Sequence, residues 1–147
     1  MSRRWPRVFG FCLLVCLLAV PSAPTPGLAE ELVVVVHPDT TFDHLSRADL
    51  INIFMGRYQQ FPDGQPAFPL DLADSSESFY RKLVDKTPAE LRSYWARLVF
   101  SGRASPPRRL PAARQLIDVV ANNPGAVGYL DRSQVDERVK IVHLLGD

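Results

Sequence analysis

Residues 32–36 read Leu-Val-Val-Val-Val, an unbroken apolar run in which four positions are β-branched. Side chains branched at Cβ favour the extended backbone of a strand over a helix. Because every position is apolar, neither face of this predicted strand can be left in water, which is typical of a sheet covered on both sides. His37-Pro38-Asp39 ends the run. The segment therefore predicts a central strand enclosed between two layers.

Further strands are predicted at 68–72, 126–130 and 139–144, and helices are predicted to begin near Ser46, Asp74, Thr87 and Ala113. Ser46 with Asp49, and Thr87-Pro88 with Glu90, are typical helix starts in which a hydroxyl and an acid three residues later cap each other. Residues 103–111 are rich in proline and arginine and predict a loop. Strands that alternate with helices at this length predict a three-layer α/β fold with a mostly parallel sheet of about four strands and about four helices.

The first 29 residues have the three-part pattern of a secretory signal peptide. Arg3, Arg4 and Arg7 precede an uncharged, mostly apolar run at 8–20, and Gly27-Leu28-Ala29 supplies small residues before a cut at Glu30. A membrane-spanning helix needs about 20 apolar residues, so a retained anchor is the weaker alternative. The pattern predicts export to the periplasm and a single domain over 30–147.

Composition excludes several functions for the remaining 118 residues, which contain no cysteine and carry 14 basic and 16 acidic side chains. A disulfide framework, a thiolate zinc site and a cysteine nucleophile are ruled out. The near-neutral charge argues against nucleic-acid binding. His37, His44 and His143 lack metal-ligand spacing, and no Ser/His/Asp or paired-carboxylate motif is present. We therefore expect no catalysis, no metal and no cofactor.

The strongest candidate for ligand binding is the helix start at 74–78, Asp-Ser-Ser-Glu-Ser. A helix N-terminus presents backbone N–H groups and a positive dipole end, which bind oxyanions such as phosphate. Asp74, Ser75, Ser76 and Ser78 are the candidate contacts, because hydroxyls can rotate to donate to phosphate oxygens. The alternative is structural, since Asp74 and Glu77 can form a capping box that satisfies the same N–H groups.

Three further side chains are weaker candidates for this oxyanion site. Arg81 lies one turn further along the helix and could supply a positive charge. Thr40 and Thr41 follow the first strand, at the end where ligands bind in open α/β sheets. The cluster of Arg103, Arg108, Arg109 and Arg114 is interpreted as a solvated loop, or as a contact for an acidic partner or anionic headgroups. The aromatic residues Tyr94, Trp95 and Phe100 are interpreted as core.

Five segments occur in an order that resembles the substrate-binding proteins of phosphate ABC transporters, and more closely a group of short, one-lobed relatives. They are residues 45–56, 63–64, 74–78, 94–102 and 123–129. The last, Asn-Pro-Gly-Ala-Val-Gly-Tyr, is the most specific. The resemblance covers about residues 32–142.

The resemblance implies a periplasmic-binding-protein-like fold, of which this chain would be one lobe of two. It implies an exported, non-catalytic protein that holds phosphate or a similar oxyanion. In that family an Arg and an Asp precede a Ser-Gly-Thr turn. By position, Asp74 corresponds to the family's Asp, Ser76 to its Ser and Ser78 to its Thr. Glu77 occupies the position of the Gly, and neither residue 71 nor residue 72 is the expected Arg. A homodimer would be one way to enclose a ligand. The alternative is a ligand-free interaction module for an envelope sensor or transport complex.

Overall fold

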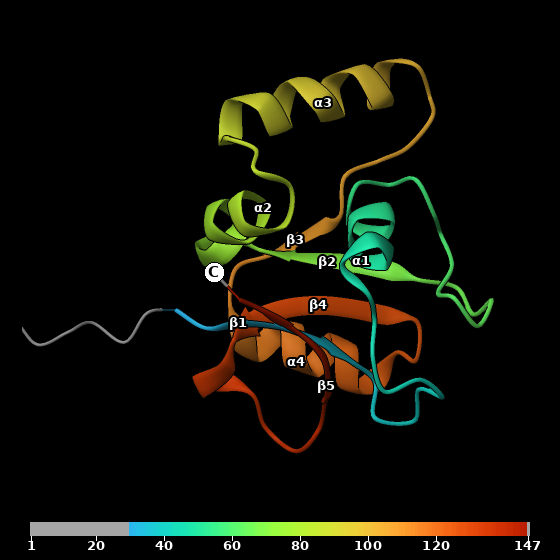
Figure 1. Ribbon diagram of the computed structural model, residues 1–147, viewed down its shortest axis with the longest axis vertical. Coiled ribbons are helices and arrows are strands. Elements are labelled where there is room, and N and C mark those ends of the chain that lie inside the picture. The colour runs from blue at the N-terminus through green and yellow to red at the C-terminus, as the bar shows by residue number, and fades with distance from the viewer. Residues whose placement is uncertain (1–29, 147) are drawn as a thin grey trace, which may run out of the picture.

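The computed structural model describes residues 30–146, so the predicted signal peptide lies outside the described residues (Figure 1). The elements in chain order are β1 Leu32–Val36, α1 Arg47–Phe54, β2 Phe68–Leu72, α2 Ser76–Val84, α3 Pro88–Phe100, β3 Arg108–Leu110, α4 Ala113–Asn122, β4 Ala126–Asp131 and β5 Lys140–Leu145. Short 3₁₀ turns, Ala73–Ser75 and Arg132–Gln134, follow β2 and β4. In the part of the chain so described, no helix is both long and apolar enough to cross a bilayer.

The five strands form one sheet in the order β3-β2-β4-β1-β5. β2 runs parallel to β3 and β4, whereas β1 is antiparallel to β4 and β5. Four of the five strands therefore point the same way, and the predicted α/β fold with a mostly parallel sheet is confirmed. All five residues of β1 are buried, as their unbroken apolar run predicts.

Helices cover both faces of this sheet and make the predicted three layers. α4 packs on one face, where Leu116 lies so close to β4 that a Cβ on Gly128 would meet its side chain at 2.9 Å. The next residue, Tyr129, points to the opposite face because side chains alternate along a strand. There it packs against Phe54 of α1 and stacks on Phe79 of α2. These aromatic contacts join α1 and α2 to the centre of the sheet.

The capping predictions for α1 and α3 are confirmed. Ser46 with Asp49, and Thr87 with Glu90, form reciprocal capping boxes in which each side chain accepts a hydrogen bond from a backbone N–H of the other residue. The capping alternative at residue 74 is wrong, because neither the 3₁₀ turn nor α2 has a side-chain cap hydrogen bond.

α3 lies outside α1 and α2 as an additional layer, farther from the sheet (Figure 1). Trp95 is buried beside Gly56, and the Tyr94 hydroxyl donates to the Met55 carbonyl at 2.7 Å, which fixes α3 to the end of α1. The prediction that Phe100 belongs to the core is wrong, since its side chain is 95% exposed. At 100° per residue, Phe100 lies about 140° around the helix axis from Trp95, so its side chain leaves α3 on a different side.

The prediction of a loop over 103–111 is wrong in part, because Arg108–Leu110 forms the strand β3. Only Leu110 of this three-residue strand is buried, so its own pattern gives no strand signal. Its conformation comes instead from parallel pairing with β2, in which Leu70, Asp71 and Leu72 lie opposite Arg108, Arg109 and Leu110.

Candidate oxyanion site

A buried carboxylate, that of Asp71, organises the polar side chains at the end of β2. Asp71 is only 5% exposed although it is ionisable. Its Oδ1 accepts a hydrogen bond from the Tyr129 hydroxyl, and its Oδ2 accepts from the Ser76 hydroxyl at 3.2 Å and from Nε of Arg109 at 2.9 Å. We call Asp71, Ser76, Arg109 and Tyr129 the Asp71 cluster. A buried charge is tolerated only when it is paired in this way.

The sheet register brings this cluster together from distant parts of the sequence. Asp71 and Arg109 are direct partners in the β2–β3 pairing, so their side chains leave the sheet on the same face. Tyr129 comes from β4, the other neighbour of β2. Ser76 opens α2, five residues after Asp71, because the 3₁₀ turn brings the chain back over the strand end.

The hydrogen bonds of the cluster leave Arg109 with unused donors. The hydroxyl of Ser76 donates to Asp71 and accepts from Nη2 of Arg109 at 3.2 Å, so its single donor is taken. A guanidinium has five N–H donors. Arg109 directs Nε and one Nη2 donor into the cluster, and its side chain is 61% exposed. Asp71 therefore holds the guanidinium in place while about three of its donors face outward.

Two buried tyrosines border the carboxylate and stay protonated. Burial, then the charge of Asp71, raises the pKa of the Tyr129 hydroxyl far above its ordinary value. Burial also raises the pKa of Tyr80, again with a contribution from Asp71. Both groups are hydroxyl donors at any physiological pH, so the Tyr129 donation to Asp71 is permanent.

A cavity of about 640 Å³ adjoins the cluster between α2 and α3. Its charged lining residues are Lys86, Arg92, Arg109, Asp71 and Glu77. Within residues 30–146, neither Lys86 nor Arg92 makes an ion pair or a side-chain hydrogen bond. Three cations therefore face two carboxylates, one of which is already neutralised by Arg109. We call this space the α2–α3 cavity, and it has the charge and donors to hold an anion.

Of the candidate contacts Asp74, Ser75, Ser76, Ser78 and Arg81, only Ser76 lines the α2–α3 cavity. The Ser75 hydroxyl donates instead to Glu30 at 2.6 Å, at the start of β1. Asp74 is exposed, and Arg81 pairs along α2 with Glu77 at 3.6 Å. Ser78 is half-buried and makes no side-chain hydrogen bond within residues 30–146.

Thr40 and Thr41 lie at the other end of the sheet. They follow the carboxyl end of β1, which is antiparallel to β4, whereas β2 is parallel to β4. Val36 accordingly lies opposite Val127, near the start of β4. The Thr40 hydroxyl donates to the His37 carbonyl, and Thr41 donates to Asp63 at 2.7 Å. The reversed direction of β1 separates these two residues from α2.

Sequence reasoning missed Asp71, Arg109 and Tyr129 as site residues. One local signal was available for Asp71, which is the only charge in the strand Phe-Pro-Leu-Asp-Leu, because a charge in a buried strand requires a partner. No local signal identifies the partner, which lies 38 residues away. Among the described residues, no group of three or more His, Cys, Asp or Glu is placed to hold a metal ion.

The fold is similar to part of several solved structures, each of them longer than this chain. Solved structures with the same fold include an ABC-type phosphate transport receptor from Vibrio cholerae, at 19% identity and a TM-score of 0.60, which matches 77% of this chain and 45% of its own. PstS from Borrelia burgdorferi matches at 15% identity and a TM-score of 0.53 over 76% of this chain and 46% of its own. A Clostridium perfringens protein solved with bound phosphate matches at 16% identity and a TM-score of 0.60 over 76% and 44%.

The chain spans less than half the length of these three structures. At such identities the likeness is one of fold. No protein-family model matches the sequence, and no curated protein matches it. The resemblance to phosphate ABC transporter substrate-binding proteins that the sequence indicates is thus confirmed in the fold.

Proposed function

We propose that this chain is an exported, non-catalytic binding lobe that holds phosphate or a similar oxyanion in the α2–α3 cavity. The observation that carries the proposal is Arg109, whose guanidinium is fixed by Asp71 and Ser76 with outward donors still unused. A guanidinium held in this way can bind a tetrahedral oxyanion through two parallel hydrogen bonds, which are stronger than bonds to a neutral donor.

Arg109 also supplies the positive charge that the family resemblance places at 71–72, where this chain has no arginine. The charge comes from β3, the neighbouring strand, rather than from β2. Lys86 and Arg92 add two further positive charges to the cavity wall. The first turn of α2 contributes its dipole and N–H groups, and it has no side-chain cap to compete with an anion.

Two features limit the expected affinity. Glu77 lines the same cavity and repels an anion. The chain also corresponds to less than half of its structural relatives, so nothing within residues 30–146 closes over the ligand from a second lobe. We therefore expect a dissociation constant between about 10 μM and about 1 mM, which is a free energy of about −7 to −4 kcal/mol.

Isothermal titration calorimetry of the purified protein with phosphate, and separately with sulfate, at low salt tests the proposal. Binding should weaken at least about tenfold, or about 1.4 kcal/mol, in Lys86→Gln and Arg92→Gln, because each removes a cation from the cavity wall. Arg109→Gln should abolish binding. A dissociation constant above about 1 mM for both anions, or equal binding by all three variants, would refute the proposal.

Arg114→Gln is the matched control, because Arg114 is exposed, lines neither the cavity nor the Asp71 cluster, and loses the same charge. Its affinity should stay within about twofold of the original, about 0.4 kcal/mol. Circular dichroism of Arg109→Gln separates lost binding from lost folding. N-terminal sequencing of the protein recovered from the periplasm tests export, with Glu30 expected as the first residue.

The second candidate function is a ligand-free interaction module of an envelope sensor or transport complex. The observation that favours it is the apolar surface at the end of α3, where Phe100 is almost fully exposed. Calorimetry separates the two candidates, because a module without ligand capture would give no heat with either anion.

A further inference from the structure

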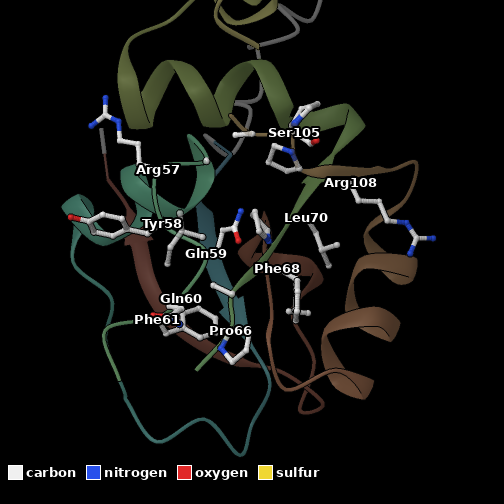
Figure 2. Close-up of a pocket in the computed structure, with 18 of the residues that line it drawn as sticks. Arg57, Tyr58, Gln59, Gln60, Phe61, Pro66, Phe68, Leu70, Ser105 and Arg108 are labelled. Atoms are coloured by element: carbon white, nitrogen blue, oxygen red, sulfur yellow. The ribbon is translucent and has the colours of Figure 1, made fainter. Parts of the chain in front are cut away.

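A second space, a groove, adjoins the α2–α3 cavity and shares Val99, Pro106 and Pro107 with it as lining residues. The loop 57–69, the segment 102–108 after α3, and residues of α4 surround a space of about 1540 Å³. In Figure 2 the side chains of Arg57 and Arg108 extend on opposite sides of the groove, and Gln59, Phe68 and Leu70 lie between them in this view. Neighbouring residues of β3 divide the two spaces, since Arg108 lines this groove and Arg109 lines the cavity.

Exposed apolar side chains gather at this groove. Tyr58, Phe68 and Val99 are among its lining residues, and their exposed fractions are 59%, 61% and 53%. Phe100, the next residue after Val99, is the most exposed large apolar side chain of residues 30–146. A concentrated apolar surface of this kind marks an interaction site, whereas single exposed apolar residues are ordinary.

The groove is larger than most small-molecule sites, so it has room for an extended chain segment. Ligand pockets usually enclose about 300–1,000 Å³. Its walls are also formed in advance. Gln60 pairs with Pro66 in an isolated bridge, the N–H of Phe61 donates to the Gln65 carbonyl at 2.8 Å, and Pro106-Pro107 restrict the opposite wall. A preformed groove lowers the entropy cost of binding an extended chain segment.

The charge of the groove indicates which kind of chain segment would bind there. Arg57, Arg103 and Arg108 line the groove against a single acid, Asp49. In residues 30–146, none of the three arginines makes an ion pair or a side-chain hydrogen bond. The groove therefore carries an uncompensated positive charge next to exposed aromatic rings, which complements acidic and apolar side chains.

The same charge argues against two other occupants. A symmetric dimer through this surface would bring the arginines of one copy against those of the other. The chain's own residues 1–29 contain three arginines and no acidic residue, so they are repelled as well. We propose that the groove is a docking site for an extended, acidic segment of a partner protein that carries aromatic or aliphatic side chains. This goes beyond the oxyanion proposal and does not depend on it.

Selection from a displayed library of random peptides tests this proposal with the full chain as bait. Peptides of roughly 12 residues are long enough, since they extend to about 40 Å. We expect the enriched peptides to combine Asp or Glu with aromatic or aliphatic residues. One enriched peptide, synthesised with a fluorophore, should bind with an affinity that falls between about 0.05 M and about 0.5 M salt.

Charge reversal at the groove should weaken binding of that peptide. In Arg57→Glu with Arg108→Glu we expect at least a tenfold loss by fluorescence polarisation, about 1.4 kcal/mol. Arg114→Glu, an exposed arginine outside the groove, is the matched control and should change the affinity less than twofold. Tyr58→Ser, which removes an exposed side chain that lines the groove, should also weaken binding.

Four outcomes would overturn the proposal. They are selection of peptides without acidic residues, equal binding by the groove variant and the control, dimerisation that the groove variant abolishes, and binding to phosphatidylglycerol vesicles that matches binding to the peptide. The first two contradict the charge argument, the third identifies a second copy as the occupant, and the fourth identifies a membrane. The Arg57→Glu, Arg108→Glu variant should bind phosphate as the original protein does. A loss of peptide binding in this variant can then be distinguished from a failure of the oxyanion proposal.

Discussion

Tyr129→Phe removes one oxygen atom from the Asp71 cluster and leaves the aromatic packing in place. The ring of Tyr129 stacks on Phe79 with centroids 3.6 Å apart and planes within 3°, and phenylalanine can keep that contact. The hydroxyl makes two buried interactions, donating to Oδ1 of Asp71 and accepting from the backbone N–H of Leu72 at 3.2 Å. The substitution thus isolates the contribution of hydrogen bonds to a buried charge.

The expected loss follows from these two interactions. A hydrogen bond to a charged group contributes about 1.5–3 kcal/mol, and a buried acceptor left unpaired costs a similar amount. Within residues 30–146, Oδ1 of Asp71 has no other donor, whereas Oδ2 keeps Ser76 and Arg109. The N–H of Leu72 loses a longer, neutral hydrogen bond of about 0.5–1 kcal/mol. We expect the free energy of unfolding to fall by about 2–4 kcal/mol.

Urea unfolding followed by circular dichroism measures this loss. With an m-value of about 1.5 kcal/mol/M, the midpoint should fall by about 1.3–2.7 M urea while the slope stays unchanged. A double-mutant cycle with Asp71→Asn locates the interaction. In the Asp71→Asn background Tyr129→Phe should cost less, with a coupling energy of at least about 1 kcal/mol.

Tyr94→Phe is the matched control, because it also removes a hydroxyl that donates a hydrogen bond. Tyr94 donates to the neutral carbonyl of Met55 at 2.7 Å and is half-buried, so its loss should be about 1 kcal/mol. If Tyr129→Phe costs no more than Tyr94→Phe, or if the cycle shows no coupling, the buried Asp71 does not depend on the hydroxyl and the reasoning fails.

Three further predictions test other parts of the structure. Burial, and then the charge of Asp71, raises the pKa of Tyr80 and Tyr129, so the unfolded chain loses these protons at a lower pH than the folded chain. The free energy of unfolding should therefore fall above about pH 10, by up to about 1.4 kcal/mol per pH unit for each tyrosine. Tyr80→Phe should reduce the slope of the urea midpoint against pH. Hydrogen bonds from the Thr87 backbone and hydroxyl lower the pKa of Glu90, so the stability that these bonds contribute is lost as pH falls below about 4. Thr87→Ala should raise the pKa of Glu90 measured by NMR. In Gly128→Ala the new Cβ would lie 2.9 Å from a buried leucine of α4, so thermal unfolding should show about 1–3 kcal/mol of destabilisation; an unchanged midpoint would contradict the close packing.

Local patterns were enough to predict most of the elements. The valine run of β1 indicates a strand buried on both faces, and each residue of it is buried. The capping residues of α1 and α3 mark helix starts because their partners lie three residues away. Signals of this kind depend only on neighbours in sequence, so they can be recognised without knowledge of the fold.

The features that the sequence could not predict depend on pairing between distant residues. β3 exists because its backbone pairs with β2, and its own residues, mostly arginine, do not favour a strand. The exposure of Phe100 has a local cause instead. Five residues turn an α-helix by about 140°, so Phe100 lies on a different side of α3 from Trp95, which is buried as predicted.

The same non-local pairing explains why the candidate site looked incomplete in the sequence. The family resemblance implies an arginine at 71–72, beside the serine-rich turn, where the chain has Asp71 and Leu72. The register instead places Arg109 opposite Asp71, so a carboxylate on β2 recruits the guanidinium from β3. A buried carboxylate with two hydroxyl donors still carries its full negative charge, and only a cation neutralises it. Asp71 therefore fixes Arg109 at the edge of the cavity. The pair itself is neutral, so the net positive charge that the proposed anion site needs comes from Lys86 and Arg92.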